Sequence, residues 1–443
     1  MQTPKQMAGI KKRFISGALA ALLLKLVGAA LSYLMFVALA RAMPFEQFGI
    51  FSFAFGLSTI LAKVAVAGQQ QYLVRDLPRH LGAAREDALA RDVLTTRSYV
   101  TVLGVSSFLM GSLLLAVLTP GIFGSGERSA LIFAALFIPI MAFSELLTST
   151  LRAYGDIVRG LAPREILWRG VICLACFGVA FSAGPILDAG IGFAIVAGLL
   201  GVIILAQAAM WPETRVWRQK FNRASFRAHP WLVTSGHLAV TSTVLFGVPM
   251  LSVVVVGLIL SPAETGPLFA ALKTAQTMGI VLMATNLVAS PLISRAYFEG
   301  KTARVQKICA ACAVAGTGFA LLIFTFLIPF GDDVLRLFGA DFAAGYPELI
   351  IFSLAYVVHA ACGANGVLLD MTKHEAQHMR VMVFSNALGL CLLPVLTALY
   401  GTIGAASAVA GSIILWNLLA VLAARRHADV DPSVFGVLRL SRT

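Results

Sequence analysis

Three lysines and one glutamate lie inside long apolar segments of the chain, where ionised side chains are rare. They are Lys25, Lys63, Lys273 and Glu145. A charge near the middle of a bilayer costs about 2.5 to 3.5 kcal/mol on insertion scales, so such a side chain normally faces a wet cavity or a partner of opposite charge. The lysines could therefore attract an anionic group. Alternatively, Lys63 and Lys273, which are nearer the ends of their segments, extend their ammonium groups to the membrane surface.

Glu145 is the only acid that falls clearly inside an apolar segment on this reading. Arg152 follows seven residues later and shares a similar helical face. Buried charges are usually paired, so we predict a structural ion pair with Arg152 or Arg169. The alternative is that Glu145 carries a coupling proton or sodium ion.

Uncharged polar residues in the apolar segments give weaker signals. His237 and His359 could face a cavity or titrate, but each is more often a packing residue. Asn286 is a further candidate for a cavity position, although an amide in such a segment commonly bonds a neighbouring helix. Gln276, Asn365 and Gln207 belong to the same weak class.

Two motifs suggest metal or redox chemistry, and we predict neither. His374-Glu375-Ala376-Gln377-His378 satisfies H-E-x-x-H, but the segment that follows it offers no Asp, Glu or His as a third ligand, and a catalytic zinc usually needs three. The pairs Cys173-x-x-Cys176 and Cys309-x-x-Cys312 lie in apolar segments, where a thiol packs as a small hydrophobe. A phosphate-binding P-loop is absent from the sequence. We expect no catalytic residue, no metal and no cofactor.

The apolar segments themselves indicate an integral membrane protein. Hydrophobic residues make up 59% of the 443 residues and charged residues only 12%, whereas soluble domains carry about 25% charge. The segments are continuous rather than alternating in polarity, which favours helices over a β-barrel. The polar connections are too short to form a soluble domain, which disfavours a membrane-anchored enzyme or glycosyltransferase. A span needs roughly 20 residues, and twelve segments qualify: about 14–40, 48–70, 98–119, 129–151, 166–183, 188–211, 231–260, 265–290, 308–330, 346–369, 381–399 and 403–424.

The positive charges predict the orientation of these helices. Of the 34 Lys and Arg, 28 fall in connections on one side of the series, while only Arg41, Arg128 and Arg336 fall on the other. Because basic loops are retained in the cytoplasm, both termini are predicted to be cytoplasmic and the number of spans even. The net charge of +13 is thereby explained by loops, and we predict no nucleic-acid partner.

The chain also repeats itself at about half its length. Pro44 and Glu46 recur as Pro262 and Glu264, each 218 positions later. Six spans per half give both copies the same orientation, an arrangement found among secondary transporters. We therefore predict two lobes of six helices, residues 1–218 and 219–443, joined by the basic loop 212–230.

At these residues the chain resembles the polysaccharide-type flippases, such as O-antigen-type lipid-linked oligosaccharide translocases, of the multidrug/oligosaccharidyl-lipid/polysaccharide exporter superfamily. The resemblance covers essentially the whole chain and is carried by LARAMPFEQFGIFSFAFGLSTILAKVAVAGQQQYLVR at 39–75, LSPAETGPLFAALKTAQTMGIVLMATNLVASPLISR at 260–295 and YGTIGAASAVAGSIILWNLL at 400–419. It implies a V of two lobes around a cavity lined largely by helices 1, 2, 7 and 8.

The resemblance also implies the cargo, an undecaprenyl-diphosphate-linked oligosaccharide moved across a bacterial inner membrane. Lys25, Lys63 and Lys273 lie on helices that it assigns to the cavity, so we predict that they contact the diphosphate. Membrane lipids and a glycan polymerase or glycosyltransferases of the same pathway are the expected partners. The alternative is a cation-coupled drug exporter of the same superfamily, which would generally rely on intramembrane carboxylates.

Overall fold

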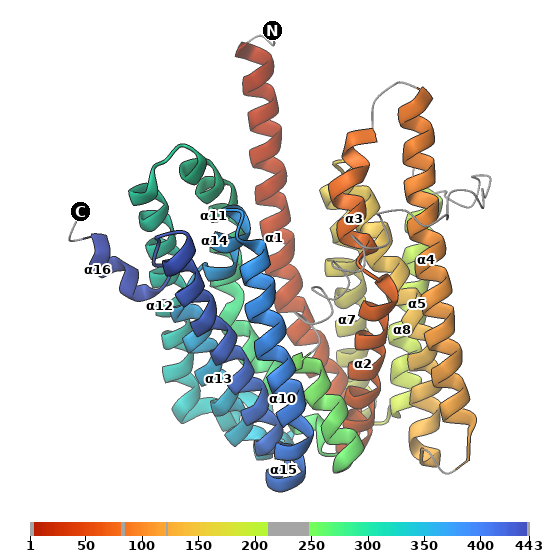
Figure 1. Ribbon diagram of the computed structural model, residues 1–443. Helices are drawn as coiled ribbons and strands as arrows, with labels where there is room; N and C mark the ends of the chain where they lie inside the picture. Colours follow the sequence, from red (N-terminus) through yellow and green to blue (C-terminus); the bar gives the residue numbers. More distant parts are fainter. Residues whose placement is uncertain (1–3, 81–84, 121–122, 211–247, 441–443) are drawn as a thin grey trace. The chain divides into compact units, whose positions relative to one another are not determined.

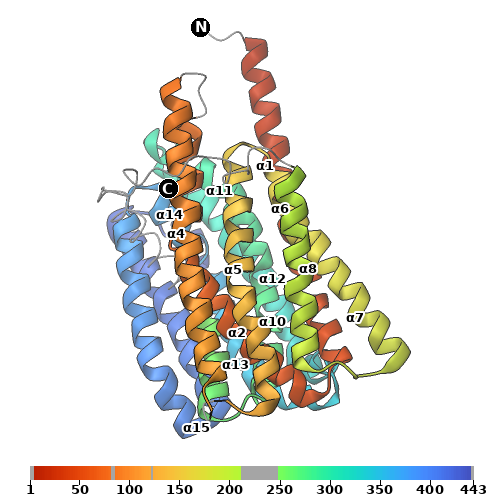
Figure 2. The ribbon, with the colours of Figure 1, turned by 90° about the vertical axis from the view of Figure 1, so that its right-hand side faces the viewer.

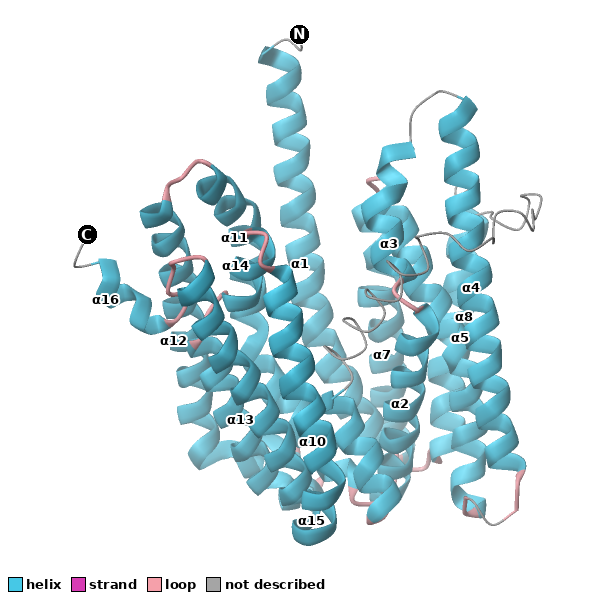
Figure 3. Cartoon of the chain, in the orientation of Figure 1, coloured by secondary structure: helices cyan, strands magenta, loops and turns pink. Residues whose placement is uncertain are grey.

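The computed structural model describes residues 4–80, 85–120, 123–210 and 248–440. Helices dominate these residues, and no strand occurs among them (Figure 3). The chain divides into two compact units, Met1–Met250 and Leu251–Thr443. The predicted joint at 212–230 lies outside the described residues, and so does most of the span predicted at 231–260.

In the described part of the first unit, six helical stretches are long and apolar enough to cross a membrane. Figure 1 shows their arrangement. Short helices connect the second stretch to the third, in a region that the sequence suggested was a polar loop. The elements are α1 (Pro4–Ala42), α2 (Phe45–Val66), α3 (Gln69–Asp76), η1 (Leu77–His80), α4 (Arg85–Leu118), α5 (Ser125–Ala153), α6 (Ile157–Ala162), η2 (Pro163–Trp168), α7 (Arg169–Ala183) and α8 (Ala189–Met210).

The boundary between the units falls inside a short apolar helix, Val248–Ile259, which is the described end of the span predicted at 231–260. Its other elements are α10 (Thr265–Gln276), η6 (Thr277–Gly279), α11 (Ile280–Phe298), α12 (Thr302–Arg336), η7 (Ala340–Gly345), α13 (Tyr346–Ala361), α14 (Asn365–Met371), α15 (Glu375–His427), η8 (Val434–Gly436) and α16 (Val437–Leu440).

The described residues contain ten helices that are long and apolar enough to cross a membrane. The last of them, α15, covers both spans predicted at 381–399 and 403–424. Gly401 has a non-helical backbone (φ 63°, ψ −144°) and marks the break between them. A left-handed φ is easily reached only by glycine. Similarly, Gly363 (φ 64°) separates α13 from α14 inside the span predicted at 346–369. The prediction of an all-helical, multi-pass membrane protein is confirmed.

The two units use the same internal packing. In the first, α5 contacts α2, α4 and α8; in the second, α13 contacts α10, α12 and α15. Helix starts also repeat, since α2 and α10 begin 220 positions apart and α5 and α13 begin 221 apart. These offsets agree with the repeat in the sequence. Superposition of the two predicted lobes stays a prediction.

Candidate functional site

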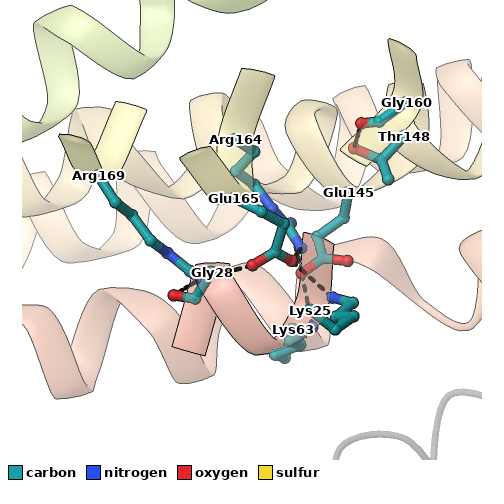
Figure 4. Close-up of polar contacts among 9 residues, drawn as sticks. All are labelled: Lys25, Gly28, Lys63, Glu145, Thr148, Gly160, Arg164, Glu165 and Arg169. Atoms are coloured by element: carbon teal, nitrogen blue, oxygen red, sulfur yellow. Dashed lines mark hydrogen bonds and ion pairs between the residues drawn. The ribbon is translucent and has the colours of Figure 1, made fainter. Parts of the chain in front are cut away.

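Six ionisable side chains of the first unit form one group, which we call the charge cluster: Lys25, Lys63, Glu145, Arg164, Glu165 and Arg169 (Figure 4). Four segments supply them, namely α1, α2, α5 and the stretch from η2 into α7. The charge cluster therefore links, through ion pairs, helices that are far apart in sequence.

Glu165 is the central acceptor of the charge cluster. Its Oε1 atom lies 2.5 Å from Lys25 Nζ and 3.6 Å from Arg164 Nη2, and its Oε2 atom lies 2.6 Å from Arg169 Nη1. Only 3% of the Glu165 side chain is exposed. A carboxylate so buried requires charged partners, and three cations supply them.

Glu145 is the second acceptor. Its Oε1 atom lies 2.7 Å from Lys63 Nζ and 2.8 Å from Arg164 Nη1, so Arg164 bridges the two carboxylates. The predicted ion pair of Glu145 is therefore present, but the predicted partners, Arg152 and Arg169, were wrong. The helical-face argument considered only residues of nearby sequence, whereas Lys63 reaches Glu145 from another helix.

A proline explains the local backbone on which Arg164 and Glu165 stand. Pro163 has no N–H, so it cannot donate to the carbonyl of Arg159 four residues earlier. Gln207 Nε2 of α8 donates to that carbonyl instead, at 2.7 Å. The chain continues as a π-helical turn over Pro163–Trp168 before α7 begins, and such turns are frequent at functional sites.

Gly28 allows α1 to approach the charge cluster. Arg169 Nη1 donates to the Gly28 carbonyl at 2.6 Å. A Cβ atom at Gly28 would lie 2.9 Å from Glu165 Oε2 and 3.1 Å from Arg169 Nη1, which is closer than real side chains allow without a shift. The absence of a side chain at position 28 is thus a condition for the observed geometry.

The charge cluster holds more positive than negative charge. Four cations face two carboxylates, which leaves two positive charges in excess. Within the described part of the chain, Arg164 Nε and Arg169 Nε are buried and have no hydrogen-bond partner. At the other extreme, 39% of the Lys25 side chain and 21% of the Lys63 side chain are exposed. The charge cluster is thus a cationic group in which two lysine side chains are partly exposed and two arginine Nε donors are buried without a hydrogen-bond partner among the described residues.

Sequence reasoning missed Glu165 and misassigned two arginines. The span was predicted to begin at 166, which placed Glu165 in a loop and Arg164 among loop residues that only set orientation. The candidate span in the structure is Ile157–Ala183, so Glu145 is not the only intramembrane acid. The i, i+4 spacing of Glu165 and Arg169 next to Pro163 was the available signal.

Three of the other residues predicted to face the cavity, Lys273, Asn286 and His359, belong to the second unit. Lys273 on α10 lies 5.1 Å from the Phe269 ring centroid and donates to Gln276 Oε1 at 3.4 Å. Asn286 on α11 has a buried Oδ1 atom with no hydrogen-bond partner among the described residues. His359 contacts Asn417 Oδ1 through Nδ1 at 2.9 Å, as expected of a packing residue. His237 lies outside the described residues.

A further buried carboxylate, Glu348, occurs in the second unit. It lies in the first turn of α13, within the candidate span Ala340–Ala361, and Thr402 Oγ1 donates to its Oε1 atom at 2.5 Å. Its Oε2 atom is buried without a hydrogen-bond partner among the residues that the structure describes. Like Glu165, Glu348 lies within a candidate span, so the prediction that Glu145 is the only acid in a span was wrong for both residues.

The H-E-x-x-H motif and the two Cys-x-x-Cys pairs show no arrangement typical of a metal site among the described residues. His374 Nδ1 bonds Thr372 Oγ1 at 3.0 Å, and His378 Nδ1 lies 2.8 Å from Asp370 Oδ1. Over the described ranges, no three His, Cys, Asp or Glu side chains are grouped so that they could hold a metal ion. Cys173, Cys176, Cys309 and Cys312 are buried thiols, which agrees with their predicted packing role.

Known proteins resemble this chain in fold far more than in sequence. The MatE family model matches residues 238–395. No curated protein sequence matches the chain. Among solved structures, the inward-facing conformation of a multidrug resistance MATE family transporter of the MOP superfamily superposes with a TM-score of 0.69, at 12% identity over 96% of this chain and 98% of the other.

Two further solved structures broaden the comparison. The lipid II flippase MurJ in its inward closed conformation has a TM-score of 0.68 at 15% identity, over 96% of this chain and 92% of the other. A MOP superfamily transporter from Pyrococcus furiosus has a TM-score of 0.60 at 14% identity, over 96% and 95% of the two chains. The chain therefore has the fold of a MOP superfamily transporter. At these identities, the comparison defines the fold and leaves the cargo open.

Proposed function

We propose that the protein is a flippase that moves an undecaprenyl-diphosphate-linked oligosaccharide, or a related lipid-linked glycan precursor, from the cytoplasmic to the outer leaflet of a bacterial inner membrane. The observation that carries this proposal is the excess of positive charge in the charge cluster. A diphosphate esterified by a prenyl chain at one end and a glycan at the other is a compact dianion, and guanidinium and ammonium groups in a poorly solvated site bind it strongly. The fold likeness to a lipid II flippase supports the same class of cargo.

The proposed role of each cation follows from its exposure. Lys25 and Lys63 present their amines at the partly exposed edge and make the first contact with the diphosphate. Arg164 and Arg169 stay buried behind them, where their unpartnered Nε donors add hydrogen bonds once the anion arrives. Glu145 and Glu165 hold the cations in place while no cargo is bound. Lys273 and Asn286 of the second lobe, with His237, are candidates for contacts to the cargo.

Transport would proceed by alternating access of the lobes 1–218 and 219–443, with both termini in the cytoplasm. The carboxylates matter for release, since they offer the cations an alternative set of partners when the diphosphate leaves. Glycosyltransferases that build the glycan and a polymerase that consumes it are the partners that such a pathway would need.

A transport assay with purified protein tests the proposal. Proteoliposomes would carry a fluorescent, short-chain prenyl-diphosphate disaccharide on the inside, and dithionite added outside would quench molecules that reach the outer leaflet. We expect protein-dependent translocation that a prenyl-monophosphate sugar supports less well. Translocation of an uncharged prenyl glycoside at an equal rate would contradict a diphosphate-reading site.

The second candidate is a cation-coupled exporter of drugs, and Glu348 is the observation that favours it. An intramembrane carboxyl group is a default candidate for proton coupling, and Glu348 Oε2 is buried without a hydrogen-bond partner among the described residues. This candidate predicts proton movement driven by a cationic drug, and its loss in Glu348→Gln or in Glu145→Gln. The charge cluster opposes it, because two excess positive charges repel a cationic drug.

A further inference from the structure

A pocket of about 400 Å³ lies in the first unit, between α4 and α8 and over α5. Figure 2 shows these three helices side by side. Its lining includes Pro139, Ile140 and Phe143 of α5 and Gly201 and Leu205 of α8. The volume is within the range of small-ligand sites, and the charge cluster contributes no residue to it.

The described lining of the pocket is almost wholly apolar. Among these residues only Tyr99 has a polar side chain, and the Tyr99 hydroxyl is already hydrogen-bonded to Thr150 Oγ1 at 3.2 Å. The part of Tyr99 that remains to line the pocket is therefore its aromatic ring. An apolar pocket of this kind stays free of water and accepts an apolar ligand.

The shape and exposure of the pocket fit a chain from the bilayer. Its lining runs from Pro139 to Leu147 on α5 and from Gly201 to Ala208 on α8, which is about 12 Å at a rise of 1.5 Å per residue. Leu205 lines it and is nevertheless 72% exposed, so the pocket is continuous with the apolar outer surface of α8. An occupant could enter sideways from the lipid.

A glycine creates much of the space. A Cβ atom at Gly201 would meet Ile140 Cδ1 at 3.7 Å, an ordinary contact, whereas a Cβ atom at Gly198 would meet nothing within 4 Å. A larger side chain at position 201 would therefore fill the pocket, and one at position 198 would only extend into open space. The two positions lie one helical turn apart on the same helix.

We propose that this pocket binds one acyl chain of a membrane phospholipid. The bound chain packs along α5 between α4 and α8, where it supplies the dispersion contacts that an empty pocket lacks. The tail of the proposed cargo is a poorer occupant, because Glu145 of the charge cluster projects from α5 about 160° around the helix from Phe143 at 100° per residue. The pocket and the charge cluster thus lie on different faces of α5.

Photo-crosslinking tests the proposal without any transport measurement. The full chain is placed in liposomes that contain a phosphatidylethanolamine with a diazirine midway along one acyl chain, and adducts are mapped by mass spectrometry. We expect adducts to concentrate on the α5 and α8 segments that line the pocket. Gly201→Leu should lower this labelling about threefold by occupying the volume, while Gly198→Leu should leave it unchanged.

Several outcomes would overturn the proposal. Adducts at the same density on the exposed apolar residue Phe181 of α7 would indicate ordinary contact with bulk lipid. Equal losses in the two leucine variants would show that the pocket is not the labelled site. A second arm uses a diazirine prenyl phosphate at the same mole fraction, and stronger pocket labelling by this probe would assign the site to an isoprenoid chain instead. The wild-type adduct map decides the matter even if Gly201→Leu does not fold.

Discussion

Lys25 Nζ of α1 lies 2.5 Å from Glu165 Oε1, across 140 residues of sequence. The lysine is thus not the isolated intramembrane charge that its sequence position suggested. Its carboxylate partner is buried and is shared with Arg164 and Arg169. Each of these residues can therefore be altered with a different expected effect on folding and on cargo binding.

Removal of the central carboxylate should damage the fold. Glu165→Gln leaves Lys25, Arg164 and Arg169 without their common acceptor, and breaking a buried ion pair on one side costs about 3 to 5 kcal/mol. We expect a clearly lower melting temperature in detergent. Glu299→Gln is the control, because Glu299 pairs with Arg295 and Lys301 at the surface, where pairs contribute little. Equal melting temperatures for Glu165→Gln and the wild type would contradict the central role of Glu165.

A methyl group at Gly28 should also disturb the charge cluster. Gly28→Ala places a Cβ atom 2.9 Å from Glu165 Oε2 and 3.0 Å from Glu165 Cβ, so α1 must move away or Glu165 must shift. We expect lower thermal stability and weaker export of the cargo. Gly104→Ala on α4 is the matched control, because nothing lies within 4 Å of its new Cβ.

The changes in thermal stability caused by Gly28→Ala and Gly104→Ala should differ in sign. Replacing glycine by alanine inside a helix normally stabilises by up to about 1 kcal/mol, so Gly104→Ala is expected to melt at the wild-type temperature or slightly above. A higher melting temperature for Gly28→Ala as well would contradict the prediction, because it would show that the space between α1 and Glu165 accommodates a methyl group.

Hydropathy was sufficient to predict most of the described helices. Each apolar run within the described residues is helical, because an unpaired backbone cannot face lipid. The breaks at Gly363 and Gly401 coincide with glycines of positive φ. The repeat from Pro44 to Pro262 predicted where α2 and α10 begin, within a few residues. Short helices such as α3 were missed because their polarity resembles that of a loop.

The charge cluster was less predictable than the fold. Lys25, Lys63 and Glu145 were identified correctly as unusual residues, since a charge in a span is costly wherever it lies. Their partners depend on which helices are neighbours and on their axial register, which periodicity does not specify. Glu165 was missed because the span was predicted to begin at 166, whereas the helical stretch begins at Ile157. The reason that Arg164 and Arg169 are buried was missed with it.

The H-E-x-x-H motif should be inert. Glu375 begins α15, and His374 and His378 already bond Thr372 and Asp370. We expect Glu375→Gln to retain wild-type export and the purified protein to contain no stoichiometric zinc by elemental analysis. Zinc at one atom per chain, together with an inactive Glu375→Gln variant, would show that the motif had been dismissed wrongly.

Lys25 provides the most direct test of a cationic cargo site. Lys25→Ala removes the most exposed cation of the charge cluster, but Glu165 keeps Arg169 at 2.6 Å and Arg164 at 3.6 Å, so the protein should insert and fold. A neutral side chain cannot replace an ammonium group as a partner for diphosphate. We therefore expect Lys25→Ala to lose most export, while Lys25→Arg keeps a substantial part.

The measurement is surface glycan in a deletion strain that expresses each variant at a matched level. Melting temperatures of the purified variants separate cargo binding from folding, because a loss of export at unchanged stability points to the cargo. Lys63→Ala should have a smaller effect, since Lys63 is less exposed than Lys25 and Arg164 remains 2.8 Å from Glu145. Wild-type export by Lys25→Ala would remove Lys25 from the cargo site and leave Lys273 as the next candidate.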